Sequence, residues 1–199
     1  MAEAKPLLNI KYHNSIIEVA SIQVNEESGD SDETYFVIKK RITNEHLNYL
    51  NESKIMQDLQ FPSIVTFYRI DSEGIIMEYC PYHDLDFIIN YDLFPIDTDQ
   101  MVVYFYQIAM AIQYLHEKDY IHRDIKPGNI FLDAKKNAKL GDFGFCRKSA
   151  DRSMSIKFTE EFAAPELRTG RYDNKIDIYS FGKTMESIMD RVNSYNDKL

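Results

Sequence analysis

The sequence predicts an α+β fold, in which a small strand-rich first lobe with one helix precedes a helical second lobe. β-Branched and aromatic residues gather in short runs through residues 1–79, whereas apolar residues recur at helical spacing through much of residues 80–199. Strand-rich segments followed by helix-rich segments are typical of segregated α+β domains. We therefore expect two lobes, residues 1–79 and residues 80–199.

The first lobe is expected to contain strands and a single helix. Its predicted strands are rich in Val, Ile, Thr, Tyr and Phe and cover residues 16–24, 34–40, 64–68 and 74–79. The acidic residues 25–34 are expected to join the first two as a solvated loop. A helix is predicted over residues 43–59, where an apolar stripe is formed by Leu47, Leu50, Met56 and Leu59.

The second lobe is expected to contain two long helices. Asp97 is a suitable N-cap for the first, with Gln100 three residues later as in a capping box. The helical period that follows is formed by Met101, Phe105, Ile108, Ile112 and Leu115. The second helix is predicted over residues 175–192, with an apolar stripe formed by Ile176, Tyr179, Met185 and Ile188.

Composition argues against several classes of protein. The 199 residues are 44% apolar, which is enough to bury a core. A net charge of -9 and a pI near 5.0 argue against a nucleic-acid partner. The chain lacks a run of about eighteen apolar residues that could span a membrane, and Cys80 and Cys146 do not form a disulfide framework. We expect a cytoplasmic protein with no membrane association.

The most informative motif is the stretch 121–129 followed by Asp142, Phe143 and Gly144. It supplies an acid, an amine, an amide and a second acid at spacings that suit phosphoryl transfer from a metal-bound nucleotide. In this order the motifs resemble those of the protein kinase family, and Lys126 favours its Ser/Thr branch. The resemblance implies a two-lobed fold, ATP and Mg²⁺ as cofactors, and Ser or Thr hydroxyls of protein substrates as phosphoryl acceptors.

The resemblance implies a role for each polar residue of the motif. Asp124 would accept or orient the proton of the acceptor hydroxyl, and Lys126 would steady the developing charge. Asn129 and Asp142 carry the hard oxygen ligands that Mg²⁺ prefers. The alternative is that Asp124 and Asn129 only stabilise turns around Pro127.

Lys39 is similar to the strand lysine with which the family holds the nucleotide phosphates. Its neighbour Lys40 is the rival, but strand alternation sends the two side chains to opposite faces. Glu52 matches the helix glutamate that pairs with this lysine, so we expect a Lys39–Glu52 ion pair. The alternative for Glu52 is a solvated surface charge.

The resemblance also implies an adenine pocket, formed by Val19, Val37, Met77, Glu78, Cys80 and Phe131. Its hinge, residues 78–80, would hold adenine through backbone groups. Val37 and Phe131 are larger than the Ala and Leu usual in the family, so we expect a narrow pocket. An apolar column that joins the two lobes is also expected, formed by Met56, Phe67, His122 and Phe143. Ordinary core packing would equally bury these residues.

The segment between Gly144 and Ala164 resembles the family's activation loop. Its hydroxyl residues are Ser149, Ser153, Ser155 and Thr159. We expect Ser153 or Ser155 to be phosphorylated and to pair with Arg123, although each serine could equally be an ordinary polar loop residue. Thr159 is expected to bridge Asp124 and Lys126, and Asp177 is expected to support the backbone of the catalytic loop.

Two further features depart from the family, besides Val37 and Phe131. No glycine precedes Gly29, so the Gly-rich phosphate loop is missing and the corresponding stretch is residues 12–19. The chain ends at Leu199, so we expect a second lobe truncated after the helix that carries Asp177. An uncovered apolar face is then expected on this helix, at Ile176, Met185 and Ile188, and it would be covered by a partner or by self-association.

These features leave three hypotheses. The first is an ATP- and Mg²⁺-dependent Ser/Thr protein kinase, favoured by the retained polar residues. The second is a binding module with little or no catalysis, favoured by the missing glycines. The third is a truncated kinase fragment that does not fold alone. We rank the enzyme first and the fragment last.

Overall fold

The computed structural model describes residues 5–12, 15–25, 32–41, 46–91, 93–151 and 158–196. The chain divides into two compact units. The first consists of residues 1–60 and 66–79, and the second of residues 61–65 and 80–199. Residues 61–65 belong to the second unit because Val65 N donates to Leu140 O at 3.0 Å and Leu140 N donates to Ser63 O at 2.8 Å. The predicted α+β class is confirmed.

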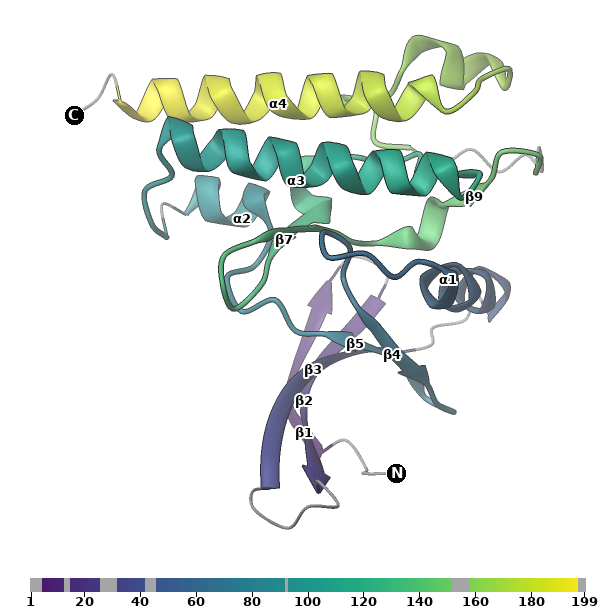
Figure 1. Ribbon diagram of the computed structural model, residues 1–199, viewed down its shortest axis with the longest axis vertical. Helices are drawn as coiled ribbons and strands as arrows, with labels where there is room; N and C mark the ends of the chain where they lie inside the picture. The colour runs from purple at the N-terminus through teal and green to yellow at the C-terminus, as the bar shows by residue number, and fades with distance from the viewer. Residues whose placement is uncertain are drawn as a thin grey trace. The chain divides into compact units, whose positions relative to one another are not determined.

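The first unit contains one five-stranded antiparallel sheet with the order β1-β2-β3-β5-β4 (Figure 1). Its strands are β1 (Lys5–Tyr12), β2 (Ser15–Asn25), β3 (Asp32–Arg41), β4 (Phe67–Ile70) and β5 (Gly74–Glu78), and its helix is α1 (His46–Asp58). The sequence did not predict β1. The strand predicted over 64–68 begins only at Phe67, because Ile64 forms an isolated bridge with Leu140 instead.

The register of this sheet assigns its side chains to two faces, because residues directly opposite each other point the same way. On what we call the Val37 face, Val37 lies opposite Ala20 and Glu78, and Lys39 lies opposite Ile76. Ala20, Val37 and Ile76 form a buried cluster there. On the other side, the Val19 face, Ile38 lies opposite Val19 and Met77, and Lys40 lies opposite Ile75.

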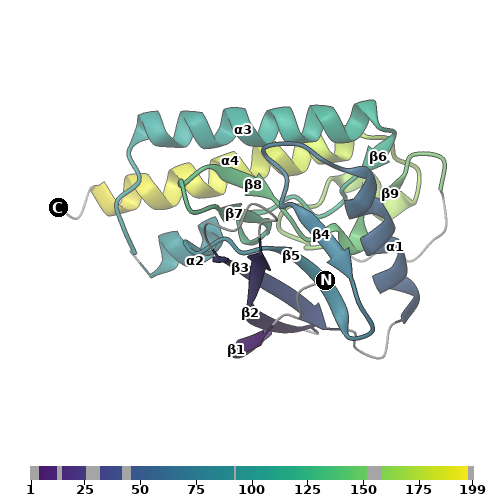
Figure 2. The same cartoon turned by 60° about the horizontal axis from the view of Figure 1, so that its bottom comes forward.

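The second unit is mainly helical. Its helices are α2 (Leu85–Asn90), α3 (Thr98–Glu117) and α4 (Lys175–Asn196), with short 3-10 turns η1 (Pro127–Asn129), η2 (Phe143–Phe145) and η3 (Pro165–Thr169). Short strands pair as β6 (Tyr120–Ile121) with β9 (Arg147–Lys148), and as β7 (Ile130–Leu132) with β8 (Ala138–Leu140). Figures 1 and 2 both show α3 and α4 side by side.

Local sequence explains why α3 begins at Thr98. The carboxylate of Asp97 accepts a hydrogen bond from the backbone N–H of Gln100 at 2.7 Å, as predicted for the N-cap. The apolar period then buries one side of the helix, at Met101, Tyr104, Ile108, Ala111, Ile112 and Leu115. Phe105, predicted in the same stripe, is only half-buried and packs edge-on against Phe181 of α4.

The predicted uncovered face of α4 is wrong. Ile176 and Ile188 are each only 1% exposed, and Met185 is half-buried. Ile176 packs against Ile121 and Leu167, so the second unit itself covers this side of the helix. The large apolar side chains that α4 exposes are instead Ile178, Tyr179 and Met189.

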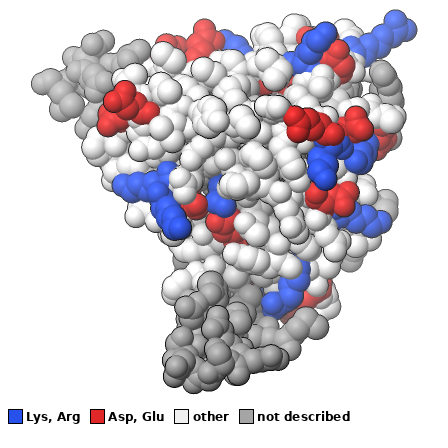
Figure 3. Space-filling model, in the orientation of Figure 1, with Lys and Arg blue, Asp and Glu red and all other residues white. Residues whose placement is uncertain are grey.

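Charged side chains of both signs are interspersed on the face of the molecule drawn in Figure 3. On the face drawn in Figure 3, Lys and Arg side chains lie among Asp and Glu side chains rather than in one patch of either sign. Near the end of α4, Arg191 pairs with Asp86 of α2 at 2.7 Å. Within the described residues, no helix combines the length and apolar character needed to cross a bilayer.

Two glycines allow a matched test of this packing. A Cβ on Gly74 would clash with the carbonyl oxygen of Lys40 and lie 3.0 Å from its carbonyl carbon, whereas a Cβ on Gly182 of α4 would meet nothing within 4 Å. We expect Gly74→Ala to lower the free energy of unfolding by about 1–3 kcal/mol. Gly182→Ala should raise it by roughly 1 kcal/mol, because alanine is the better helix former. Urea denaturation measures both. A Gly74→Ala variant as stable as the parent chain would contradict the β3–β5 register.

Candidate active site

Asp124 is the centre of a buried hydrogen-bond network in the second unit. Thr159 donates to Asp124 Oδ1 at 2.8 Å, and Lys126 Nζ lies 2.8 Å from Asp124 Oδ2 and 2.8 Å from the Thr159 hydroxyl. Asn129 Nδ2 donates to the backbone oxygen of Asp124 at 2.7 Å and to Oδ2 at 2.9 Å. The predicted Thr159 bridge is therefore present. The structure brings Asp124, Lys126 and Asn129 together, although they are not consecutive in the chain.

Asn129 and Asp142 have the chemistry to hold a divalent cation. Asn129 commits its amide nitrogen to Asp124, which leaves its oxygen as the atom able to coordinate a metal. Gly141 N donates to Asn129 O at 2.9 Å, so the chain just before Asp142 runs beside Asn129. Asp142 is exposed and adopts the left-handed conformation, with φ 55°. A carboxylate and an amide oxygen are hard ligands that fit Mg²⁺.

Asp177 of α4 supports the catalytic loop from within the core. It is 0% exposed, and its carboxylate accepts from the backbone N–H of His122 at 2.8 Å and of Arg123 at 2.9 Å. His116 of α3 adds a third bond, from Nε2 to Oδ2 at 2.9 Å, and donates because an ionised carboxylate can only accept. The predicted support role of Asp177 agrees with these contacts.

His122 and Arg123 link the catalytic loop to the segment that carries Asp142. The His122 ring meets the Phe143 ring edge-on at 5.1 Å, and His122 Nε2 donates to Gly141 O at 3.1 Å. Arg123 Nε donates to Phe145 O at 2.6 Å, and Arg123 is only 5% exposed. Of the predicted apolar column, His122 and Phe143 are thus in contact within the second unit.

The expected Lys39–Glu52 pair is wrong, because the rival lysine makes it. Lys40 Nζ lies 2.8 Å from Glu52 Oε1 and 3.1 Å from Oε2, and Glu52 is only 5% exposed. Lys39 pairs instead with Asp71 at 3.0 Å and with Glu73. Strand alternation separates the two lysines as predicted, but α1 contributes Glu52 to the Val19 face, on which Lys40 lies.

The charges around Lys39 shift one another's pKa. Burial lowers the pKa of Lys39, but the hydrogen bonds that its ammonium donates to Glu73 and Asp71 outweigh burial, so the pKa is raised above its ordinary 10.5. The bond to Lys39 lowers the pKa of Glu73 below 4.5. Burial raises the pKa of Asp71, but backbone N–H donors and Lys39 bring it below 3.8. These pairs therefore stabilise the unit from about pH 4.5 up to about pH 10.5, and weaken as pH falls through the lowered carboxyl pKa values.

The predicted adenine residues do not share one surface of the sheet. Val19 and Met77 lie on the Val19 face with Lys40, whereas Val37 and Glu78 lie on the Val37 face with Lys39. The prediction of one adenine pocket rests on the order of the motifs in the family, and this order does not specify the face of the sheet to which each side chain points. The carboxylate of Glu78 is also engaged, since it accepts from Thr66 N at 3.0 Å and from the Thr66 hydroxyl at 2.8 Å.

Two predicted pocket residues lie in the second unit. Cys80 is 8% exposed, and neither Cys80 nor Cys146 forms a disulfide. The Phe131 ring lies so close to Gly141 that a Cβ there would be 2.8 Å from Phe131 Cε2. Phe131 therefore packs directly against the residue before Asp142. Ser153 and Ser155 lie outside the described residues.

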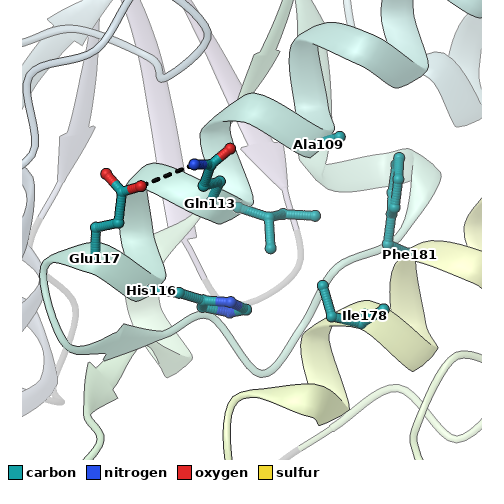
Figure 4. Close-up of a pocket in the computed structure, with 7 residues that line it drawn as sticks. Ala109, Gln113, His116, Glu117, Ile178 and Phe181 are labelled. Carbon is teal, nitrogen blue, oxygen red and sulfur yellow. Dashed lines mark hydrogen bonds between the residues drawn. The ribbon is translucent and has the colours of Figure 1, made fainter.

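A groove of about 640 Å³ lies between α3 and α4 (Figure 4). Ile178 and Phe181 of α4 face α3 across it, and the remaining lining residues are Ala109, Ile112, Gln113, His116 and Glu117. Gln113 donates to Glu117 at 2.8 Å at its rim. His116 was not predicted, although it follows Ile112 by one helical turn on a side that the period marks as buried.

The contacts of Asp177 generate a stability prediction. Asp177→Asn replaces one acceptor oxygen by a donor that faces backbone N–H groups, so we expect the free energy of unfolding to fall by roughly 2–4 kcal/mol. Asp173→Asn is the matched control. Asp173 is exposed and its carboxylate accepts from the backbone N–H of Lys175 at 2.9 Å, so a loss of at most about 1 kcal/mol is expected. Guanidinium denaturation compares the two, and equal losses would contradict the anchoring role.

Comparison with known proteins agrees with this geometry. The model of the protein kinase domain family matches residues 18–198. The chain is 38% identical over 149 residues to "Serine/threonine-protein kinase CLA4" of Candida albicans, which is 70% of this chain and 15% of the relative. It is 36% identical over 165 residues to "Serine/threonine-protein kinase Nek5" of Mus musculus, covering 76% of this chain and 26% of that protein.

A third relative is "eIF-2-alpha kinase GCN2" of Schizosaccharomyces pombe, which is 43% identical over 128 residues, 54% of this chain and 8% of the relative. The chain thus spans only 8–26% of the length of these three relatives. The match nevertheless runs from β2 to the end of α4 and includes both the Asp124 network and its Asp177 support. This chain belongs to the protein kinase family.

Proposed function

We propose that this chain transfers the γ-phosphoryl group of ATP to Ser or Thr hydroxyls of protein substrates, with Mg²⁺ as the metal. The observation that carries the proposal is the network of Asp124, Lys126 and Thr159. In that network a carboxylate and an ammonium hold one aliphatic hydroxyl, each at 2.8 Å. A substrate Ser or Thr hydroxyl presents the same chemistry to the same two groups.

The roles of the side chains follow from their contacts. Asp124 accepts the hydrogen bond of the acceptor hydroxyl and orients its oxygen toward the phosphorus. Lys126 places a positive charge beside the same oxygen, which stabilises the negative charge that develops during transfer. Asn129 fixes Asp124 through bonds to its backbone and side chain, so the carboxylate is held before substrate arrives.

Mg²⁺, held by Asn129 and Asp142, would neutralise charge on the nucleotide phosphates. We place the metal at these two residues because Asn129 retains its oxygen and Asp142 is exposed beside it. In the described residues no cluster of three or more His, Cys, Asp or Glu side chains offers a rival site.

For the nucleotide phosphates we assign Lys40 in place of Lys39. Lys40 is oriented by Glu52, whereas Lys39 is held by Asp71 and Glu73 at the turn between β4 and β5. The Glu52 carboxylate is only 5% exposed, so this ion pair holds the Lys40 ammonium in a defined position, where its positive charge would attract an anionic ligand. On this assignment Val19 and Met77, which share the Val19 face, remain candidate adenine contacts.

The second candidate function is a binding module that uses the kinase fold without transfer. It is favoured by the β1–β2 hairpin, where Tyr12 pairs with Ser15 and no glycine offers bare backbone to a phosphate. The retained Asp124 network favours the enzyme instead. A cytoplasmic location and a protein substrate stay predictions.

The transfer reaction can be tested directly with labelled ATP and a generic acceptor protein. We expect Asp124→Asn to lower incorporation by about 10²–10⁴-fold, because it removes the base that orients the acceptor. Asp99→Asn, on the exposed first turn of α3, should keep the parent rate. Phosphoamino-acid analysis should find phosphoserine or phosphothreonine. Equal incorporation by the parent and Asp124→Asn would refute catalysis, and failure of Mg-ATP to raise Tm at millimolar concentration would favour the module.

The two neighbouring lysines provide an internal comparison. Lys40→Met should lower kcat/KM for ATP by about 10²-fold or more, because it removes a positive charge from the phosphates and breaks the ion pair with Glu52. Lys39→Met should stay within about threefold of the parent, because the partners of Lys39 among the described residues are the acids of the β4–β5 turn. Steady-state kinetics over a range of ATP concentrations distinguishes them. The opposite order of effects would return the phosphate role to Lys39.

A further inference from the structure

Tyr172 lies on the segment between η3 and α4 and contacts the catalytic loop. Arg123 NH1 donates to its hydroxyl at 3.0 Å. The Tyr172 ring packs against a buried apolar cluster, whose members are Ile121, Ala164, Leu167 and Ile176. Packing of the ring therefore fixes where the hydroxyl lies, and the hydroxyl is an acceptor available to the arginine without any rearrangement.

Arg123 is held at both ends by one short stretch of chain. Its backbone N–H donates to Asp177 at 2.9 Å, while its guanidinium donates to Tyr172, five residues earlier in the chain. A third contact, from Nε to Phe145 O at 2.6 Å, ties the same side chain to η2. Arg123 thus joins the catalytic loop, the segment after Asp142 and the start of α4, and it directly precedes Asp124.

A second guanidinium group lies near Arg123, so the hydroxyl oxygen of Tyr172 is important there as a hydrogen-bond acceptor. Arg147 lies close enough that its pKa is lowered, first by burial and then by the charge of Arg123. Arg147 NH1 donates to Gly144 O at 3.1 Å and to Cys146 O at 2.6 Å. Two guanidinium groups with like charge therefore lie in a largely buried region. Each oxygen that accepts a hydrogen bond from them offsets part of the free-energy cost of burying their charge.

We propose that Tyr172 is a positioning residue for phosphoryl transfer, which acts by fixing Arg123 and through it the orientation of Asp124. The inference rests on the proposed function for its kinetic consequence, but its structural part does not depend on activity. The contact also holds Arg123 through unmodified groups of the chain.

The test is Tyr172→Phe, which removes one oxygen and keeps the ring in the apolar cluster. We expect kcat to fall about tenfold, the size expected for a hydrogen bond to a charged group, while KM for ATP changes less than about twofold. Backbone hydrogen exchange of residues 121–125 should accelerate by a similar factor. Exchange in α2 should not change, because α2 lies outside this network, and Tm should shift by only a few degrees.

Tyr179→Phe is the matched control, because it makes the same chemical change on an exposed tyrosine of α4. It should leave kcat and hydrogen exchange unchanged. A double-mutant cycle of Tyr172→Phe with Arg123→Lys should be strongly non-additive, since lysine cannot span both Phe145 O and the phenol. Additive effects in this cycle would overturn the proposal.

The outcomes separate this inference from the proposed function. If the parent chain transfers no phosphate but Tyr172→Phe still accelerates exchange at 121–125, the enzyme assignment fails and the positioning contact stands. If the parent chain is active and Tyr172→Phe matches it in kcat, KM and exchange, the proposal for Tyr172 is wrong and the enzyme assignment stands. Uniform acceleration of exchange in every segment would mean a general loss of stability and would also overturn it.

Discussion

The candidate site depends on one buried carboxylate. Asp177 accepts from two consecutive backbone N–H groups, those of His122 and Arg123, and from His116, while being fully excluded from solvent. Burying a charge is costly unless its acceptor oxygens are satisfied, so these donors and the carboxylate require one another. Because α4 is packed into the core, the loop bonded to Asp177 is anchored to that helix. The position of Asp124 therefore depends on a residue that lies outside its own hydrogen-bond network.

The local motifs of the second unit could be predicted from sequence because the chain carries them in the order and at the spacing that resemble those of the protein kinase family. Asp124, Lys126 and Asn129 occur within six residues of each other, and a single turn around Pro127 brings them together. Thr159 was also predicted, through family resemblance, and its bridge at 2.8 Å from both partners agrees. His116 and Tyr172 were missed, because their partners lie far away in sequence and no short pattern marks them.

The first unit shows where sequence reasoning fails. Alternation correctly placed Lys39 and Lys40 on opposite faces, but it cannot tell which face meets a helix that arrives later in the chain. For the same reason, Val19 and Val37 were predicted to line one pocket although they lie on opposite faces of the sheet. β1 was missed for a different reason, since residues 5–12 contain a proline, two lysines and few β-branched residues. Such a composition is tolerated because β1 is an edge strand that needs to pair only with β2.

Backbone strain shows how tightly the site is specified. Arg123 and Asp142 are not glycines, yet they adopt φ values of 71° and 55° in the left-handed region. Conformations of this kind cost about 1–3 kcal/mol each and persist only where surrounding contacts enforce them. For Arg123 those contacts are Asp177 at the backbone and Tyr172 and Phe145 O at the side chain. For Asp142 they are the Gly141 bond to Asn129 before it and the η2 turn after it. Glycine at position 123 or 142 would relieve the strain, but it would also remove the side chain of Arg123 or of Asp142. The backbone strain is therefore retained together with the side chains that keep Asp124 and Asp142 in place.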